Sequence, residues 1–344
     1  MRFGPVALAD SIGGIVAHAV RHDGLVLKKG DLVRPDHLPL LEAAGLNEIV
    51  VAHLEDGDVG EDAAAQRLAQ AVAGAGAHLR VEAPFTGRSN IFSTTAGVLA
   101  FDGAGVDRIN EVDETITIAT LPVWRTVVEG EMIATVKIIP FAVPGAALER
   151  ALSAAQGLSL TVAPFKPLRI GVISTLLPGL KPSTIVKTLR VLEGRLAPAG
   201  ACVVAEERVT HEAPALTQAI QAMAPLCDLL IVYGASAITD RRDVIPAALE
   251  AAGGRIAHFG MPVDPGNLLL VGALTRDGVE IPVLGAPGCA RSPKENGFDW
   301  VLHRLLAGLP VTGADIRRMG VGGLLMEIVS RGQPRTGEAS TPDE

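Results

Sequence analysis

The chain has 344 residues, enough for two domains with separate hydrophobic cores, and its 48% apolar and 20% charged residues are typical of a compact soluble protein. The net charge of −8 argues against a duplex nucleic-acid partner, because phosphate backbones are bound by basic surfaces. The three cysteines, Cys202, Cys227 and Cys289, are too few and too scattered for a disulfide framework or a zinc site. With no signal-peptide pattern and no long apolar run, we expect a soluble cytoplasmic protein without membrane contact.

The first half of the chain mixes helical and strand patterns. A short helix is expected at 34–45 and a β-branched strand at 47–54. An alanine-rich helix with an acidic first turn follows at 60–76, and short strands separated by turns continue from 79 to 144. We expect residues 1–150 to form a smaller α+β or β-rich region, and a connecting helix at 147–157.

The second half alternates apolar strands with amphipathic helices. The strand at 169–175 is followed by a helix at 183–200 that Ser183 caps, and the alternation continues to a last helix at 294–308. Such alternation predicts an α/β domain over 166–310, a mostly parallel sheet between two helical layers. Residues 311–330 form an extension, and 331–344 lack any periodicity and are expected to be a disordered tail.

Four loops follow strands of this second domain, at 173–184, 233–243, 260–267 and 284–293. In open parallel sheets, ligands bind at the carboxyl ends of the strands. Small residues in these loops expose backbone N–H groups, and Ser236, Thr239 and Ser292 add hydroxyl donors. Asp240 and Asp243 could hold a hydroxyl, a ring N–H edge or a magnesium ion, although Asp243 is equally well placed as a helix N-cap. Each loop alone is an ordinary turn, whereas the four together predict a pocket.

Three of the loops resemble those of the molybdopterin-binding domain family. The segment 233–250 is similar to the signature loop of molybdopterin adenylyltransferases, with one inserted residue, and it matches at Gly234, Ser236, Thr239, Arg242, Asp243, Val244 and Pro246. The loop 286–293 resembles the Pro-Gly-Asn-Pro-x-Ser loop of molybdopterin molybdenumtransferases and retains Pro287, Gly288 and Ser292. The loop 263–267 resembles that enzyme's Pro-Gly-Lys-Pro loop and retains Pro265 and Gly266. Residues 25–60 show a weaker similarity to the molybdenumtransferase's N-terminal half.

The resemblance implies the molybdopterin-binding fold and assigns roles to residues of the four loops. Asp243 would be the catalytic and magnesium-binding residue. The cofactor-binding residues would be Thr175, Gly234, Ser236, Thr239, Asp240, Arg242, Asp243, Pro265, Gly266, Pro287, Gly288 and Ser292. The chain departs from the family pattern where Ala235 and Ala237 replace glycines and where 174–177 lacks the Asp-Glu pair of the molybdenumtransferase. These departures leave open whether the chain is catalytic.

The resulting hypothesis is a protein of molybdenum cofactor biosynthesis or maturation, with molybdopterin as its cofactor and Mg²⁺ if it is transferase-like. Expected partners are molybdopterin or its nucleotide form, a nucleotidyltransferase or a molybdoenzyme, and a second copy of the chain in a homo-oligomer. One alternative is a non-catalytic carrier or chaperone of the cofactor, which the missing Asp-Glu pair favours. A second alternative is a nucleotide amidohydrolase of the competence-protein type on the same fold.

Overall fold

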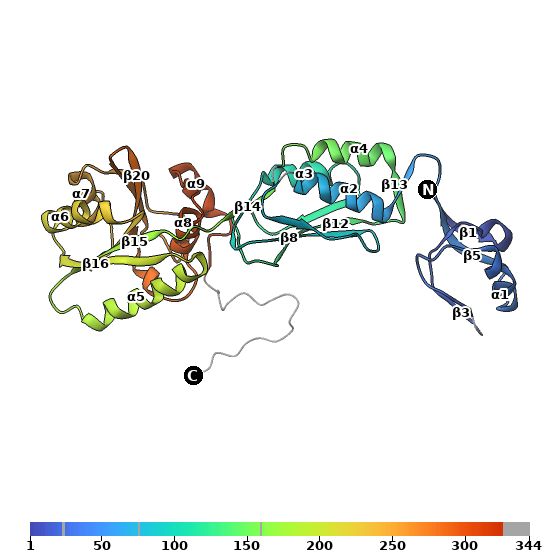
Figure 1. The fold of residues 1–344 in the computed structure, drawn as a ribbon, viewed down its shortest axis with the longest axis horizontal. Helices are drawn as coiled ribbons and strands as arrows, with labels where there is room; N and C mark the ends of the chain where they lie inside the picture. The colour runs from blue at the N-terminus through green and yellow to red at the C-terminus, as the bar shows by residue number, and fades with distance from the viewer. Residues whose placement is uncertain (23–24, 75, 159, 326–344) are drawn as a thin grey trace. The chain divides into compact units, whose positions relative to one another are not determined.

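The computed structural model describes residues 1–325 apart from 23–24, 75 and 159, and the chain divides into two compact units, Met1–Pro164 and Phe165–Glu344 (Figure 1). The expected disordered tail at 331–344 lies outside the described residues. Within the described part of the chain, no helix has both the length and the apolar character that a membrane span requires.

The first part of unit 1 has a small hydrophobic core of its own, which extends from Leu8 to Val51. Its three-stranded antiparallel sheet has the order β1–β5–β2, and β3 and β4 form a separate hairpin. The expected helix at 34–45 begins as the 3-10 turn η2 and continues as α1. The elements are β1 (Arg2–Ala7), η1 (Leu8–Ser11), β2 (Ile15–Val16), β3 (Val20–His22), β4 (Leu25–Leu27), η2 (Pro35–His37), α1 (Leu38–Ala43) and β5 (Glu48–His53).

The second part of unit 1 packs three helices against a four-stranded antiparallel sheet of order β10–β12–β8–β7 (Figure 1). The alanine-rich helix α2 buries Ala65, Leu68 and Val72, whose spacing places them on one helix face. The helix expected to be a connector, α4, is part of this core, because Leu148 and Ala151 are fully buried in it. Two small sheets, β11–β9–β14 and β13–β6, complete the unit. The elements are β6 (Asp58–Gly60), α2 (Glu61–Ala73), β7 (Leu79–Val81), β8 (Arg88–Ser93), β9 (Gly97–Ala100), α3 (Gly103–Asn110), β10 (Ile116–Thr120), β11 (Thr126–Val127), β12 (Met132–Ile138), β13 (Ala142–Pro144), α4 (Gly145–Ala154) and β14 (Thr161–Pro164).

Unit 2 is built on one six-stranded sheet of order β16–β15–β17–β20–β19–β18. Neighbouring strands are parallel from β16 to β20, whereas β19 is antiparallel to both β20 and β18. The sheet is therefore mixed, and β18 runs in the same direction as β20. The strands are β15 (Arg169–Leu176), β16 (Cys202–Thr210), β17 (Leu229–Tyr233), β18 (Arg255–Phe259), β19 (Leu270–Arg276) and β20 (Val279–Ala286).

The strand β19 is absent from the sequence-based expectation. It forms a hairpin with β20 through Asp277 and Gly278, which have positive φ angles of 49° and 77°. A two-residue turn with positive φ at both positions is the tight type that joins antiparallel strands.

Helices cover both faces of this sheet. Alternate residues of the central strands face opposite sides, so Val172 packs against α5 and α8, whereas Ile173 packs against α6 and α7. The strand β17 is buried at every position, as expected of a central parallel strand. The helices are α5 (Pro182–Leu196), α6 (Ala213–Met223), α7 (Val244–Ala251), α8 (Gly297–Leu306) and α9 (Gly313–Arg317), with the 3-10 turns η3 (Ala197–Ala199), η4 (Ala224–Leu226), η5 (Gly288–Arg291) and η6 (Arg318–Gly320).

Two details of these helices differ from expectation or extend it. Helix α5 has Lys181 as its N-cap and Pro182 at the first helical position, so Ser183 is not the cap. The extension after residue 310 contains α9 and η6, and its Ile316 and Met319 are buried in the same core as α8.

Candidate functional site

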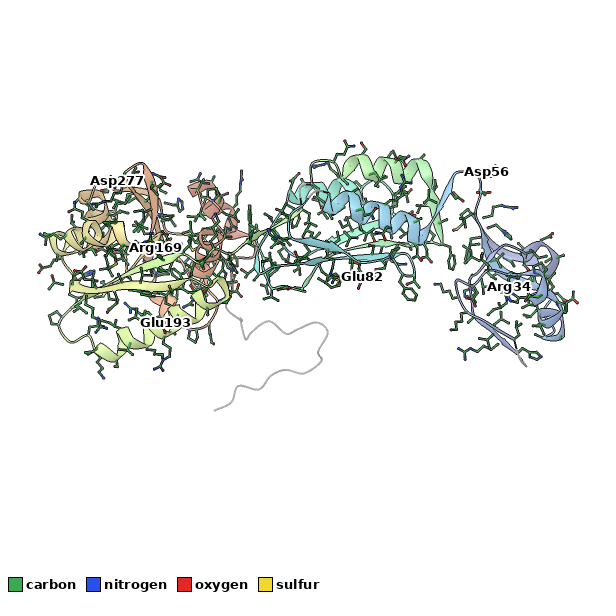
Figure 2. The ribbon with its side chains drawn as sticks, in the orientation of Figure 1. Arg34, Asp56, Glu82, Arg169, Glu193 and Asp277 are labelled. Carbon is green, nitrogen blue, oxygen red and sulfur yellow. The ribbon has the colours of Figure 1, made fainter. Side chains whose placement is uncertain are left out.

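The carboxyl ends of five strands meet at one edge of the six-stranded sheet, because β16, β15, β17, β20 and β18 run in the same direction. The loops that follow β15, β17, β20 and β18 are the four that the sequence singles out. Arg169, the first residue of β15, and Asp277, in the turn before β20, are labelled in Figure 2 and mark the opposite edge. There an ion pair of 2.8 Å between Arg169 Nη2 and Asp228 Oδ1 joins the beginnings of β15 and β17.

Thr175 connects three of the strand ends. Its side chain is fully buried, and its Oγ1 accepts a hydrogen bond of 2.8 Å from the backbone N–H of Ala235, after β17. The same hydroxyl lies 2.8 Å from Nδ1 of His211, which follows β16. A hydroxyl can accept one bond and donate another, so Thr175 satisfies both contacts. His211 carried no motif in the sequence, and only the parallel alignment of β15 and β16 brings it here.

The loop after β17 turns sharply at Gly234 and ends at the N-terminus of α7. A Cβ atom at Gly234 would lie 2.5 Å from the carbonyl oxygen of Ser236, so only glycine fits this turn. Ser236 and Thr239 are exposed. Asp240 pairs with Arg242 at 2.7 Å, and the hydrogen bond from Arg242 lowers the pKa of the Asp240 carboxyl.

Asp243 is the N-cap of α7. Its Oδ1 accepts a hydrogen bond of 2.8 Å from the N–H of Val244, and its Oδ2 accepts one of 3.2 Å from the N–H of Thr239. The carboxylate therefore closes the loop 239–243 and caps the helix. Each oxygen has a second lone pair, so these two bonds leave acceptor capacity on the carboxylate.

The loop after β20 is held in place by Arg195 of α5. Arg195 donates to the carbonyl oxygens of Ala290 and Ser292, both at 2.7 Å, and forms an ion pair with Asp299 of α8. Both charged side chains are only 8% exposed, so the pair is shielded from solvent. Pro287 is buried at the beginning of this loop, whereas Gly288 is exposed, and a Cβ atom there would meet nothing within 4 Å. Ser292 accepts a hydrogen bond from Lys294 N through its side chain.

The loop after β18 packs against the start of α8. The carbonyl oxygen of Pro265 accepts a hydrogen bond of 2.8 Å from the N–H of Gly297. A Cβ atom at Gly266 would lie 2.9 Å from the Cα of Gly297, so a close approach of two backbones requires glycine at this position. The structure thus gives Pro265 and Gly266 a packing role at the same edge.

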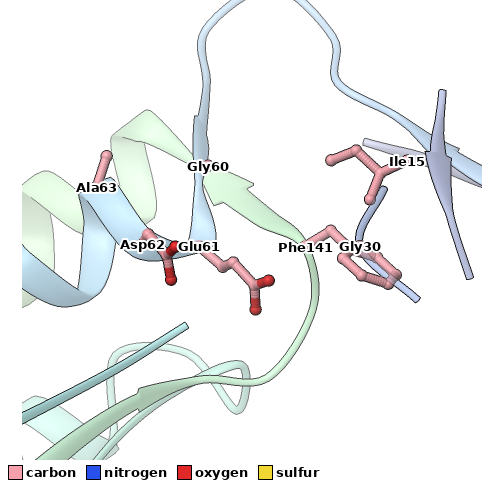
Figure 3. A pocket seen from close by; sticks show the side chains of 7 residues that line it. All are labelled: Ile15, Gly30, Gly60, Glu61, Asp62, Ala63 and Phe141. Atoms are coloured by element: carbon pink, nitrogen blue, oxygen red, sulfur yellow. The ribbon is translucent and has the colours of Figure 1, made fainter. Parts of the chain in front are cut away.

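A separate hollow of about 230 Å³ lies in unit 1 and contains none of these residues (Figure 3). It is lined by Ile15, Gly30, Gly60, Glu61, Asp62, Ala63 and Phe141. Burial raises the pKa of Glu61, although Lys137, whose Nζ is 3.6 Å from Glu61 Oε2, acts in the opposite direction. The loop chemistry that the sequence identified lies in unit 2, so the hollow is not part of that candidate site.

No protein-family model matches the chain, and no curated protein matches it. Among solved structures, a molybdenum cofactor biosynthesis protein from Pyrococcus furiosus is 12% identical with a TM-score of 0.26, and the match covers 90% of this chain and 64% of that protein. The molybdopterin biosynthesis protein MoeA from Pyrococcus horikoshii is 14% identical with a TM-score of 0.30, and the match covers 89% of this chain and 75% of that protein. The molybdopterin biosynthesis enzyme MoaB from Thermus thermophilus is 17% identical with a TM-score of 0.27, and the match covers 42% of this chain and 98% of that protein. TM-scores this low do not establish a shared fold.

Proposed function

We propose that the chain binds molybdopterin or its nucleotide form at the carboxyl edge of the six-stranded sheet and takes part in molybdenum cofactor biosynthesis or maturation. The observation that carries this proposal is the convergence of the loops after β15, β17, β20 and β18 upon one edge. The end of β15 is joined to the loop after β17 by Thr175, the loop after β20 is joined to α5 by Arg195, and the loop after β18 is joined to the start of α8 by Pro265. A rim that is held together before the ligand arrives loses little conformational entropy on binding.

The residues at this rim fit a flat, phosphorylated ligand. Gly288 leaves backbone uncovered, and Ser236, Thr239 and Ser292 supply hydroxyl donors for the phosphate or the pterin. Asp243 would accept from the N–H edge of the pterin, or bind Mg²⁺, with the lone pairs that its two backbone hydrogen bonds leave.

If the chain is catalytic, its reaction would be a nucleotidyl or molybdenum transfer in which the rim positions the reacting groups. A non-catalytic carrier of the cofactor is the second candidate, and one observation favours it. The segment 176–180, which leaves β15, contains no carboxylate. The two carboxylates of the loop after β17 are already engaged, Asp240 by Arg242 and Asp243 by backbone N–H groups.

The proposal is tested by mass spectrometry of pterins that remain bound after anaerobic purification. Gly288→Trp places a large side chain in the open space at the rim and should remove bound pterin. Gly194→Trp is the matched control, because a Cβ atom at this exposed position of α5 also meets nothing within 4 Å. We expect pterin with the wild type and the control only. Equal pterin in all three proteins, or none in the wild type, contradicts the proposal.

Turnover assays with molybdate, Mg²⁺ and adenylylated molybdopterin then separate the two candidates. Metal-dependent product formation identifies a transferase, whereas stable retention of the pterin without turnover identifies a carrier. Hydrolysis of a pyridine nucleotide, with no pterin bound, would instead indicate an amidohydrolase.

A further inference from the structure

Arg291 is a partly buried cation that contacts only neutral acceptors. Its Nη1 donates to Thr188 Oγ1 of α5, and its Nη2 donates to the carbonyl oxygen of Gly234, both at 2.9 Å. No carboxylate of the described residues pairs with it. Arg195, which lies in the same region, has Asp299 as its counter-ion. Buried charges are normally paired, so the arrangement around Arg291 lacks a negative charge.

Two unpartnered hydroxyl groups lie on the strands next to Arg291. Ser174 and Tyr233 are each only 1% exposed. Neither Ser174 Oγ nor the Tyr233 hydroxyl makes a hydrogen bond within the described part of the chain. Ser174 and Tyr233 are register partners at the carboxyl ends of β15 and β17. The guanidinium carbon of Arg291 stands 5.3 Å from the centre of the Tyr233 ring. Burial raises the pKa of the Tyr233 hydroxyl to about 12, so this group remains a proton donor at neutral pH.

The charges and donors of this cluster select an anion. A guanidinium without a counter-ion and two hydroxyl groups whose protons meet no acceptor among the described residues all favour negative charge. Two of the five guanidinium N–H groups meet the acceptors named above, and the planar fork is suited to a phosphate or carboxylate. Asp299, the acid that lies near Tyr233, is already engaged, since it pairs with Arg195.

We propose that Arg291 anchors the phosphate monoester of the ligand that binds at this edge, with the Ser174 and Tyr233 hydroxyls as adjacent donors. The identity of that ligand rests on the proposed function, whereas the anion site rests on the cluster itself. Arg291 occupies the loop after β20 and donates to the loop after β17, so an anion held here would lie between the two loops that carry Ser236 and Ser292.

The experiment is a calorimetric titration of the full chain with inorganic phosphate at constant ionic strength. Wild type should bind phosphate saturably, and Arg291→Gln should weaken binding at least tenfold, the smallest loss expected when a charged donor is removed. Arg291→Lys keeps the charge without the fork and should fall between the two. Arg190→Gln is the matched control, an exposed arginine of α5, and should bind as the wild type does. Unchanged affinity in Arg291→Gln, or no saturable binding by the wild type, overturns the proposal.

A second variant separates charge from packing. Thr188→Val removes the hydroxyl that accepts from Arg291 but keeps the guanidinium, so it should lower the melting temperature and retain phosphate binding. Loss of phosphate binding in Thr188→Val as complete as in Arg291→Gln would overturn the proposal, because both effects would then follow from a loosened loop.

The two proposals fail differently. If phosphate binding depends on Arg291 but no pterin co-purifies with the wild type, the anion site stands and the proposed function is wrong. If pterin co-purifies equally with wild type and Arg291→Gln, the proposed function stands and the anchoring role of Arg291 is overturned.

Discussion

Substitution of Asp243 distinguishes a ligand-binding carboxylate from a helix cap. Asp243→Ala removes the hydrogen bonds to the N–H groups of Val244 and Thr239. Loss of an N-cap costs about 1 kcal/mol, and loss of the second bond costs about 1 kcal/mol more at most. We therefore expect the free energy of unfolding of unit 2 to fall by about 1–2 kcal/mol. Asp243→Asn should change it little, because asparagine caps helices as well as aspartate does.

The asparagine variant isolates the charge. If Asp243 accepts from the pterin edge or binds Mg²⁺, both variants should weaken ligand binding by roughly 10- to 100-fold. Unfolding in urea can be followed by the fluorescence of Trp300 in a Trp124→Phe background, because the chain has two tryptophans, one in each unit. Bound pterin is measured in the same proteins. Wild-type pterin content in Asp243→Asn, together with lower stability of Asp243→Ala, would show that Asp243 is only a cap.

Three further outcomes follow from the contacts. Arg195→Met should lower the free energy of unfolding of unit 2 by about 3–5 kcal/mol in urea, because Asp299 is left buried without a counter-ion. An additional Asp299→Asn removes that charge but keeps an oxygen that can accept from the N–H of Asn296, so it should recover part of this loss; no recovery would contradict the charge argument. Burial raises the pKa of Glu61, so the Glu61 carboxyl binds its proton more tightly in the folded unit 1 than in the unfolded chain. The free energy of unfolding of unit 1 should therefore decrease as pH rises from the ordinary glutamate range through the raised pKa. Urea unfolding across this pH range should show a shallower decrease for Glu61→Gln, and equal slopes would refute the assignment. Burial also raises the pKa of the Cys227 thiol, so a disulfide reagent should modify the exposed Cys202 rapidly and Cys227 only after denaturant is added, as peptide mapping would show.

The order of helices and strands in unit 2 was largely accessible from the sequence. The apolar runs that became β15 and β17 and the helical spacing of Ile185, Leu189, Leu192 and Leu196 are local signals. The structure buries three of these four helix residues and half-buries Leu189. The expected elements do not include β19, although Asp277-Gly278 is a strong hairpin signal.

The candidate site was less accessible. The four loops were identified from their glycine, proline and hydroxyl residues, and the direction of the strands brings their starting points to one edge. The residues that hold the loops together, His211, Arg195 and Arg291, carried no recognisable motif. They come from segments up to about a hundred residues away from their partners, as Arg195 and Ser292 illustrate.

The sequence by itself determined most of the strands and helices of unit 2 and which loops carry small and hydroxyl-bearing residues, since periodicity and turn chemistry act between residues that are near each other in the chain. Only the tertiary structure decided that β19 reverses the sheet and that Arg195 has a counter-ion while Arg291 has none. Whether a charge is paired depends on contacts between distant segments, and those contacts exist only once the sheet has aligned its strands and the helices have packed upon it.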